Sequence, residues 1–225
     1  MTRRPNAAEL ASAGAQTIPD VIRTGLDVLF CGINPGLWSG ALGQHFARPG
    51  NRFWPALHRS GFTPRQLRPD EQRELLSYGL GVTNLVPRTT ARADELGQDE
   101  MKSGAQRLTE VAVRYRPAWV AVLGVTAYRA GFQRPRARIG RQDDEVGPSG
   151  IWVLPNPSGL NAHYQLDALA EEFALLGVPV VTAENPTLGP PCRGRQPNAH
   201  FLPRAGQKSC HEGHLVGATL SCRVC

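Results

Sequence analysis

The hydrophobic pattern of the chain predicts strands that alternate with helices. Continuous apolar runs begin at Leu26, Gly81, Ala118 and Ile151, and such runs are typical of buried strands in a parallel sheet. Apolar positions at helical spacing predict helices between and after them, at 51–60, 69–79, 98–115, 126–132 and 165–176. This alternation predicts an α/β fold: a three-layer αβα sandwich around a central, mainly parallel sheet of four to five strands.

Other stretches lack this periodicity. Residues 133–150 are charged and interrupted by Gly and Pro, which predicts a loop, whereas 178–182 could add a small edge strand. We expect residues 1–17 to form a flexible N-terminal arm. After Glu184 the composition becomes rich in Pro, Gly and Arg, so 185–225 is expected to be a disordered tail. The folded domain is therefore predicted to span 18–184.

Composition and charge narrow the class of protein. With 225 residues, 41% of them hydrophobic, the chain can bury a full-sized core, which excludes collagen-like and disulfide-stapled small proteins. The formal net charge is +6, and all but two of the basic residues are Arg, which suits recognition of an anionic partner. Residues 185–225 contain five basic residues and one acidic residue, however, so most of the net charge lies outside the predicted domain.

The expected location follows from what the chain lacks. No apolar run is long enough for a membrane helix or a secretory signal. Cys31 lies in a predicted strand and the other cysteines lie in the tail, so no disulfide framework spans the domain. We expect a cytoplasmic, nucleoid-associated protein that is not secreted and has no membrane partner.

Two similar motifs end the first and fourth predicted strands. Gly32-Ile33-Asn34-Pro35-Gly36 follows the first, and Asn156-Pro157-Ser158-Gly159-Leu160-Asn161 follows the fourth. Ligands of open α/β sheets bind outside the carboxyl ends of the strands. Each motif could instead be only a tight turn, since Gly, Pro and Asn favour turns for conformational reasons.

Four segments, in order, carry a specific resemblance: GINPG, FARPGNRFW, GVTNLVPRTT and NPSGL. They are similar to the mismatch-specific uracil/thymine-DNA glycosylases of the uracil-DNA glycosylase superfamily, over roughly residues 19–182. The resemblance implies the uracil-DNA glycosylase-like form of the α/β sandwich, with 18–184 as the glycosylase domain.

The resemblance assigns Asn34 as the catalytic residue, whose carbonyl oxygen would hold the attacking water. Glycosidases ordinarily use two carboxylates, but neither motif contains Asp or Glu, so positioning and a good leaving group would have to suffice. Uracil-specific branches carry Asp in the first motif and His in the second, so the asparagines here favour the weaker, mismatch-type chemistry. Base-binding residues are expected at Ile33, Phe46, Asn84 and Asn156. Phe46 would stack on the base or, alternatively, belong to the core, and Asn84 could instead bond a phosphate or only cap its turn.

The second motif is expected to enter the duplex. Flipping a nucleotide leaves a hole that an apolar wedge fills, and Leu160 matches the family's wedge, although a buried packing role is the alternative. Gly159 and Asn161 would contact the orphaned guanine. Residues 161–163, Asn-Ala-His, depart from the Arg-containing form of some relatives. Phosphate contacts are expected at Ser39, Arg52 and Ser158, where solvated or helix-capping roles are the alternatives.

No cofactor is expected. Cys210, His214, Cys222 and Cys225 have a spacing that could bind zinc, but a tail with unligated thiols is the favoured interpretation. His45 and His58 are interpreted as packing or surface residues rather than ligands or bases.

The predicted function is that of a monofunctional DNA glycosylase in base excision repair. It would flip and excise uracil, and less readily thymine or modified pyrimidines, mispaired with guanine, and leave an abasic site. The partners would be double-stranded DNA with G:U or G:T mispairs and the enzymes that process abasic sites, and the protein is expected to be a monomer. The alternative is a catalytically weak module of the same fold that binds mismatches or abasic sites.

Overall fold

The computed structural model describes residues 3–177, and it confirms the predicted fold class. A five-stranded sheet has the order β2-β1-β3-β5-β4, in which all neighbours are parallel except β4 and β5. Its strands are β1 (Val28–Gly32), β2 (Leu80–Asn84), β3 (Trp119–Leu123), β4 (Gly140–Val146) and β5 (Ser149–Leu154). Four strands therefore end at the same edge of the sheet.

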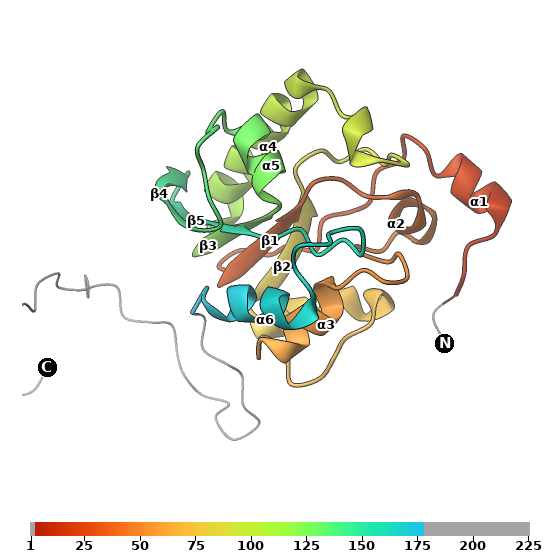
Figure 1. The fold of residues 1–225 in the computed structure, drawn as a ribbon, viewed down its shortest axis with the longest axis horizontal. Coiled ribbons are helices and arrows are strands. Elements are labelled where there is room, and N and C mark those ends of the chain that lie inside the picture. The colour runs from red at the N-terminus through yellow and green to blue at the C-terminus, as the bar shows by residue number, and fades with distance from the viewer. Residues whose placement is uncertain (1–2, 178–225) are drawn as a thin grey trace, which may run out of the picture. The chain divides into compact units, whose positions relative to one another are not determined.

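Helices cover both faces of the sheet (Figure 1). Helices α4 (Gln98–Tyr115) and α5 (Val125–Gly131) lie on one face, and α3 (Phe53–Arg59) and α6 (Leu166–Ala174) lie on the other. The remaining elements are α1 (Ala7–Ser12), α2 (Leu37–Leu42), and the 3₁₀ helices η1 (Pro69–Tyr78) and η2 (Ala93–Glu95). None of the helices between residues 3 and 177 is long and apolar enough to cross a membrane.

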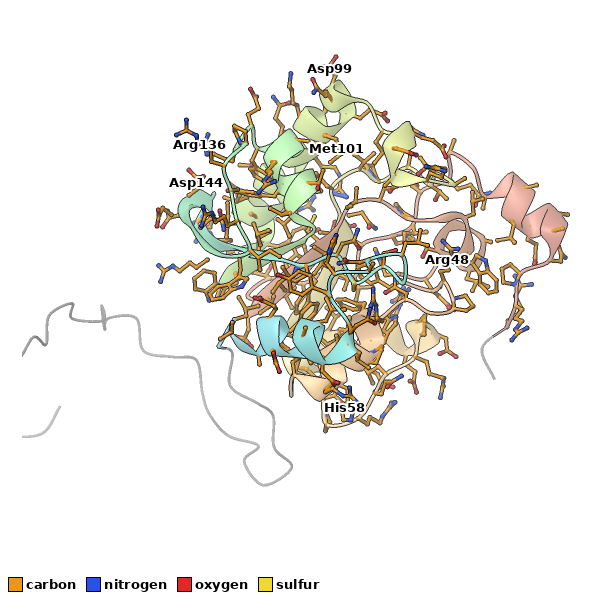
Figure 2. The ribbon with its side chains drawn as sticks, in the orientation of Figure 1. Arg48, His58, Asp99, Met101, Arg136 and Asp144 are labelled. Atoms are coloured by element: carbon orange, nitrogen blue, oxygen red, sulfur yellow. The ribbon has the colours of Figure 1, made fainter. Side chains whose placement is uncertain are left out.

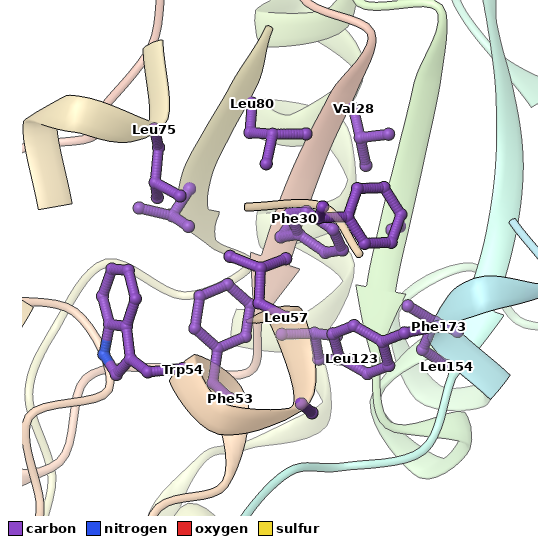
Figure 3. Close-up of a cluster of buried hydrophobic side chains, with 14 of the residues drawn as sticks. Val28, Phe30, Phe53, Trp54, Leu57, Leu75, Leu80, Leu123, Leu154 and Phe173 are labelled. Atoms are coloured by element: carbon purple, nitrogen blue, oxygen red, sulfur yellow. The ribbon is translucent and has the colours of Figure 1, made fainter. Parts of the chain in front are cut away.

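Alternate residues of β1 pack into two separate cores. Phe30 faces α3 and α6, where its ring lies 5.5 Å from that of Phe53 and 5.7 Å from that of Phe173 (Figure 3). Cys31, the next residue, faces the opposite core with Leu108 of α4. A continuously apolar strand is buried on both faces in this way, as its sequence predicts.

The region 133–150 differs from the prediction, because the expected loop contains strand β4. This strand pairs antiparallel with β5 at the edge of the sheet, and its side chains alternate between exposed and partly buried. Arg141, Asp143 and Glu145 occupy exposed positions. Charged residues protect an edge strand against further pairing, but they give no hydrophobic alternation from which to predict it.

The chain before the predicted domain contains a helix, and the C-terminal end of that domain lies outside the described residues. Residues 7–12, inside the segment expected to be a flexible arm, form α1, whose N-terminus is capped by Asn6 and Glu9. The possible strand at 178–182, the domain boundary at 184 and the tail with its Cys and His residues lie outside the described residues.

Candidate functional site

A cavity of about 160 Å³ lies at the carboxyl ends of the parallel strands. Pockets for drug-sized ligands occupy roughly 300–1,000 Å³, so this one suits a single small ring. The residues that line it come from several loops and include Gly32, Ile33, Asn34, Ser39, His45, Phe46, Arg48, Asn84, Thr90, Arg92, Leu123, Asn156 and Ser158. Among the described residues of this lining there is no Asp or Glu, so a water bound here meets no carboxylate base.

The Asn34 side chain is held by its nitrogen. Nδ2 donates to the backbone oxygens of Pro35 and Arg88 at 3.1 and 3.2 Å, and to Oγ1 of Thr90 at 2.7 Å. Backbone carbonyls only accept hydrogen bonds, so the atom facing them must be the amide nitrogen. The carbonyl oxygen is therefore the atom of the amide that is left to hold a ligand.

The segment that anchors Asn34 is itself fixed. The hydroxyl of Thr90 donates to the Arg92 carbonyl at 2.7 Å, and the backbone N–H of Thr90 donates to the Pro35 carbonyl at 3.1 Å. Arg88 is paired with Glu100 of α4, and this hydrogen-bonded pair lowers the pKa of Glu100 to about 2. Sequence reasoning used GVTNLVPRTT only as part of a resemblance and missed Thr90 as a partner of Asn34.

Phe46 lies between the core and the cavity. Its ring stacks on buried Phe53, with centroids 4.1 Å apart and an interplanar angle of 26°. Its φ of +53° is unusual for a residue other than glycine and costs on the order of 1–3 kcal/mol, so surrounding contacts must hold it. The two interpretations of Phe46 are thus compatible, because the ring both packs on the core and lines the cavity.

Asn84 and His45 form a buried pair beside Gly32. Asn84 lies in register with Gly32 on the neighbouring strand, and a Cβ at Gly32 would come within 2.5 Å of the Asn84 Oδ1 atom. The Nδ2 atom of Asn84 lies 3.2 Å from Nδ1 of His45. Burial lowers the pKa of His45, which favours the neutral ring.

The second motif is stabilised mainly by bonds within its own loop. Oδ1 of Asn156 accepts the N–H of Ser158 at 3.0 Å, and Nδ2 of Asn161 donates to the Asn156 carbonyl at 2.9 Å. Arg52 donates to the carbonyls of Ser158 and Asn161. The side chain of Leu160 is left 79% exposed at the tip of this loop.

A glycine is required where the loop 156–161 meets the loop before α3. A Cβ at Gly159 would lie 2.7 Å from the carbonyl oxygen of Gly50. Arg48, Gly50, Ser158 and Leu160 line a shared cavity of about 280 Å³ between these two loops. Contact of the backbones thus sets the position from which Leu160 projects.

The structure brings most of the predicted site residues together. Seven of them line the first cavity: Ile33, Asn34, Ser39, Phe46, Asn84, Asn156 and Ser158. Gly159 and Leu160 lie on the adjacent loop. Arg52 and Asn161 line none of these cavities, since both fasten that loop.

Two of the residues expected to contact phosphate, Arg52 and Ser39, make hydrogen bonds within the protein. The Arg52 guanidinium donates to two backbone carbonyls of the loop 156–161 and to that of Tyr164. Ser39 is buried, and its Oγ accepts the N–H of Ala47 at 3.3 Å. Contact of these two side chains with phosphate stays a prediction.

Comparison with known proteins identifies the fold and the family. A family model described as the uracil DNA glycosylase superfamily matches residues 19–175. A solution NMR structure of a "putative Uracil DNA glycosylase" from Methanosarcina acetivorans superposes with a TM-score of 0.51 at 16% sequence identity. The match covers 72% of this chain and 96% of that chain, and it agrees with the sheet described above.

Proposed function

Because the chain belongs to the uracil DNA glycosylase superfamily, whose members act as DNA glycosylases, we propose that it excises uracil mispaired with guanine. Thymine and modified pyrimidines would be poorer substrates. Hydrolysis of the N-glycosidic bond would leave an abasic site, which other repair enzymes would process.

The observation that carries this proposal is the anchored amide of Asn34. Three acceptors hold its nitrogen, which leaves the carbonyl oxygen to bind a water in a cavity lined by no carboxylate among the described residues. An amide oxygen can orient a water molecule, but it is too weakly basic to take the water's proton before the nucleobase departs. The reaction therefore depends on a leaving group that departs readily and on a water already in position.

This chemistry favours uracil over thymine. The departing uracil anion is stabilised by two carbonyl groups, and the methyl group of thymine makes its anion a slightly poorer leaving group. The ring of Phe46 would stack on the flipped base, an interaction worth about 1–3 kcal/mol per base in other proteins. Flipping costs least at a mispair, so the duplex itself contributes to the selectivity.

The exposed Leu160 supports action on duplex DNA. An apolar side chain that is 79% exposed on a fastened loop has little role in folding, but it is suited to enter a base stack. Its position beside the cavity agrees with the flipped base entering the cavity while Leu160 fills the vacated space.

The test is excision from a labelled duplex that contains one G:U pair, under single-turnover conditions, followed by alkaline cleavage of abasic sites. Wild-type protein should cleave the strand, and Asn34→Ala should abolish nearly all cleavage while it still binds the duplex. Asn6→Ala is the matched control: it makes the same change at the cap of α1 and should leave the rate unchanged.

Two results would contradict the proposal. An intact substrate with wild-type protein in molar excess would favour the alternative of a binding module for mismatches or abasic sites. Equal cleavage by wild type and Asn34→Ala would remove Asn34 from the reaction.

A further inference from the structure

We propose that His45 is a positioning residue that fixes the amide of Asn84 so that its oxygen faces the base cavity. A base with an N–H at N3, such as uracil or thymine, would then be preferred over cytosine, which carries a lone pair there. The inference rests on the proposed function, since it concerns how the same cavity distinguishes its substrates.

The orientation of the Asn84 amide follows from the hydrogen bond that His45 makes on its other side, to the Pro19 carbonyl. Nε2 of His45 lies 3.0 Å from the backbone oxygen of Pro19, which can only accept, so Nε2 must carry the hydrogen. In a neutral imidazole the other nitrogen is then an acceptor. The atom of Asn84 that faces Nδ1 of His45 at 3.2 Å must accordingly be the donor, Nδ2.

The Asn84 oxygen consequently points the other way. It lies next to Gly32 and close to the Phe46 ring, since a Cβ built on Gly32 would come within 2.5 Å of Oδ1 and 3.2 Å of the ring. All three residues line the cavity. A base stacked on Phe46 would meet this oxygen, and an amide turned by half a rotation would instead present an N–H group to it.

The surrounding chain holds His45 rigidly. Its side chain is buried, its backbone N–H donates to Gln72 at 2.7 Å, and its carbonyl accepts from Trp54. Pro19 lies in the segment that pairs with β2 through the bridge between Val21 and Val82. These bonds fix the backbone of His45, and a turn of the ring that exchanged its two nitrogens would break the bonds of Nε2 to Pro19 and of Nδ1 to Asn84.

Protonation of His45 would reverse the arrangement. A second ring hydrogen on Nδ1 would need an acceptor, so the Asn84 amide would turn its oxygen toward His45 and its nitrogen toward the cavity. Burial lowers the pKa of the ring, whereas its bond to the Pro19 carbonyl and the charge of Asp20 raise it, and Asp20 is itself bound to Thr83 and Arg107. Since burial dominates, the ring is neutral at pH 7 and would gain the proton only under more acidic conditions.

The first test compares excision of uracil and cytosine placed opposite the same mispairing base, thymine, so that neither has a Watson–Crick partner. His45→Phe removes the acceptor, and the uracil-to-cytosine rate ratio should fall roughly tenfold or more. His45→Gln supplies an oxygen that can accept from Asn84 and should restore much of the ratio. His58→Phe is the matched control, because the His58 ring bonds to the Thr63 carbonyl and lies at the lower edge of the view, away from Arg48 of the site (Figure 2).

The second test asks whether the effect passes through Asn84. In an Asn84→Ala background, His45→Phe should no longer change the uracil-to-cytosine ratio, whereas independent roles would give additive losses. On acidification, uracil excision by wild type should fall more steeply than excision by His45→Gln, which has no ring to protonate.

The outcomes separate the two proposals. Loss of all excision in the wild type would overturn the proposed function. Normal excision from G:U duplexes, with an unchanged uracil-to-cytosine ratio in His45→Phe or with additive losses in the double variant, would overturn the role of His45 alone. Thermal unfolding of each variant excludes loss of folding as the cause of a lower rate.

Discussion

The two asparagine turns beside the cavity are alike in sequence and differ in what they present. After β1, the amide nitrogen of Asn34 is bound by a segment from another part of the chain, and its oxygen is left for a ligand. After β5, the oxygen of Asn156 closes its own turn, and the loop presents the apolar side chain of Leu160. The same kind of turn thus offers a polar atom in one place and an exposed apolar side chain in the other, because different partners hold the two turns.

The largest expected effect separates the two asparagines directly. Asn34→Ala should lower the single-turnover rate on G:U duplex by roughly 100-fold or more, as loss of a preorganised polar group does elsewhere. Asn156→Ala removes the bond to the Ser158 N–H and should cost about tenfold or less. Equal losses in the two variants would contradict the division of roles.

The next effect concerns the wedge. Leu160→Ala should lower excision from duplex DNA by about tenfold, because nothing then fills the space left by the flipped base. Excision from single-stranded DNA, where no stack must be opened, should be nearly unchanged. Because the side chain is 79% exposed, the melting temperature should also stay the same, and a large loss of stability would show that Leu160 packs in the fold instead.

A smaller effect tests how the Asn34 amide is anchored. Thr90→Val keeps the size of the side chain but removes the 2.7 Å bond to Asn34 Nδ2. Two backbone carbonyls still hold the amide, so the rate should fall by only about three- to tenfold, with binding of the duplex unchanged. Thr126→Val, an exposed change on α5, is the control that should alter neither quantity.

Hydrophobic periodicity was sufficient to predict the fold, and it failed where periodicity is absent. Residues 98–115 were predicted as a helix and form α4 with the same bounds, since apolar positions recur along one face. Strand β4 was missed because its residues are polar on both sides. A strand that lies at the edge of a sheet and packs little against the core leaves almost no hydrophobic signal.

The position of the site could be predicted from the sequence, but its internal bonds could not. Asn34, Asn84 and Asn156 each lie at or just after the end of a predicted strand. Because parallel strands end at one edge of the sheet, their common location could be predicted. The partner of Asn34 is 56 residues away and that of Asn84 is 39 residues away, and no local pattern links them. His45 was interpreted as a packing residue for the same reason: its hydrogen bonds depend on which segments the fold brings together.

The smallest expected effect on chemistry tests how the loop 156–161 is held in place. Arg52 donates to three carbonyls of the loop and the residues after it, at positions more than a hundred residues away in the sequence. Hydrogen bonds from a charged donor contribute about 1.5–3 kcal/mol each, but a loosened loop can still bond to water, so Arg52→Gln should lower stability by about 1–3 kcal/mol. Excision from duplex should fall only a few-fold, and excision from single strands should not fall.

Arg136→Gln, at an exposed position on the opposite side of the view from Arg48 of the site (Figure 2), should change neither stability nor rate. If Arg52 instead contacted phosphate, its variant would keep wild-type stability and weaken duplex binding with a shallower dependence on salt, so calorimetry and a salt titration of the two variants decide between the roles.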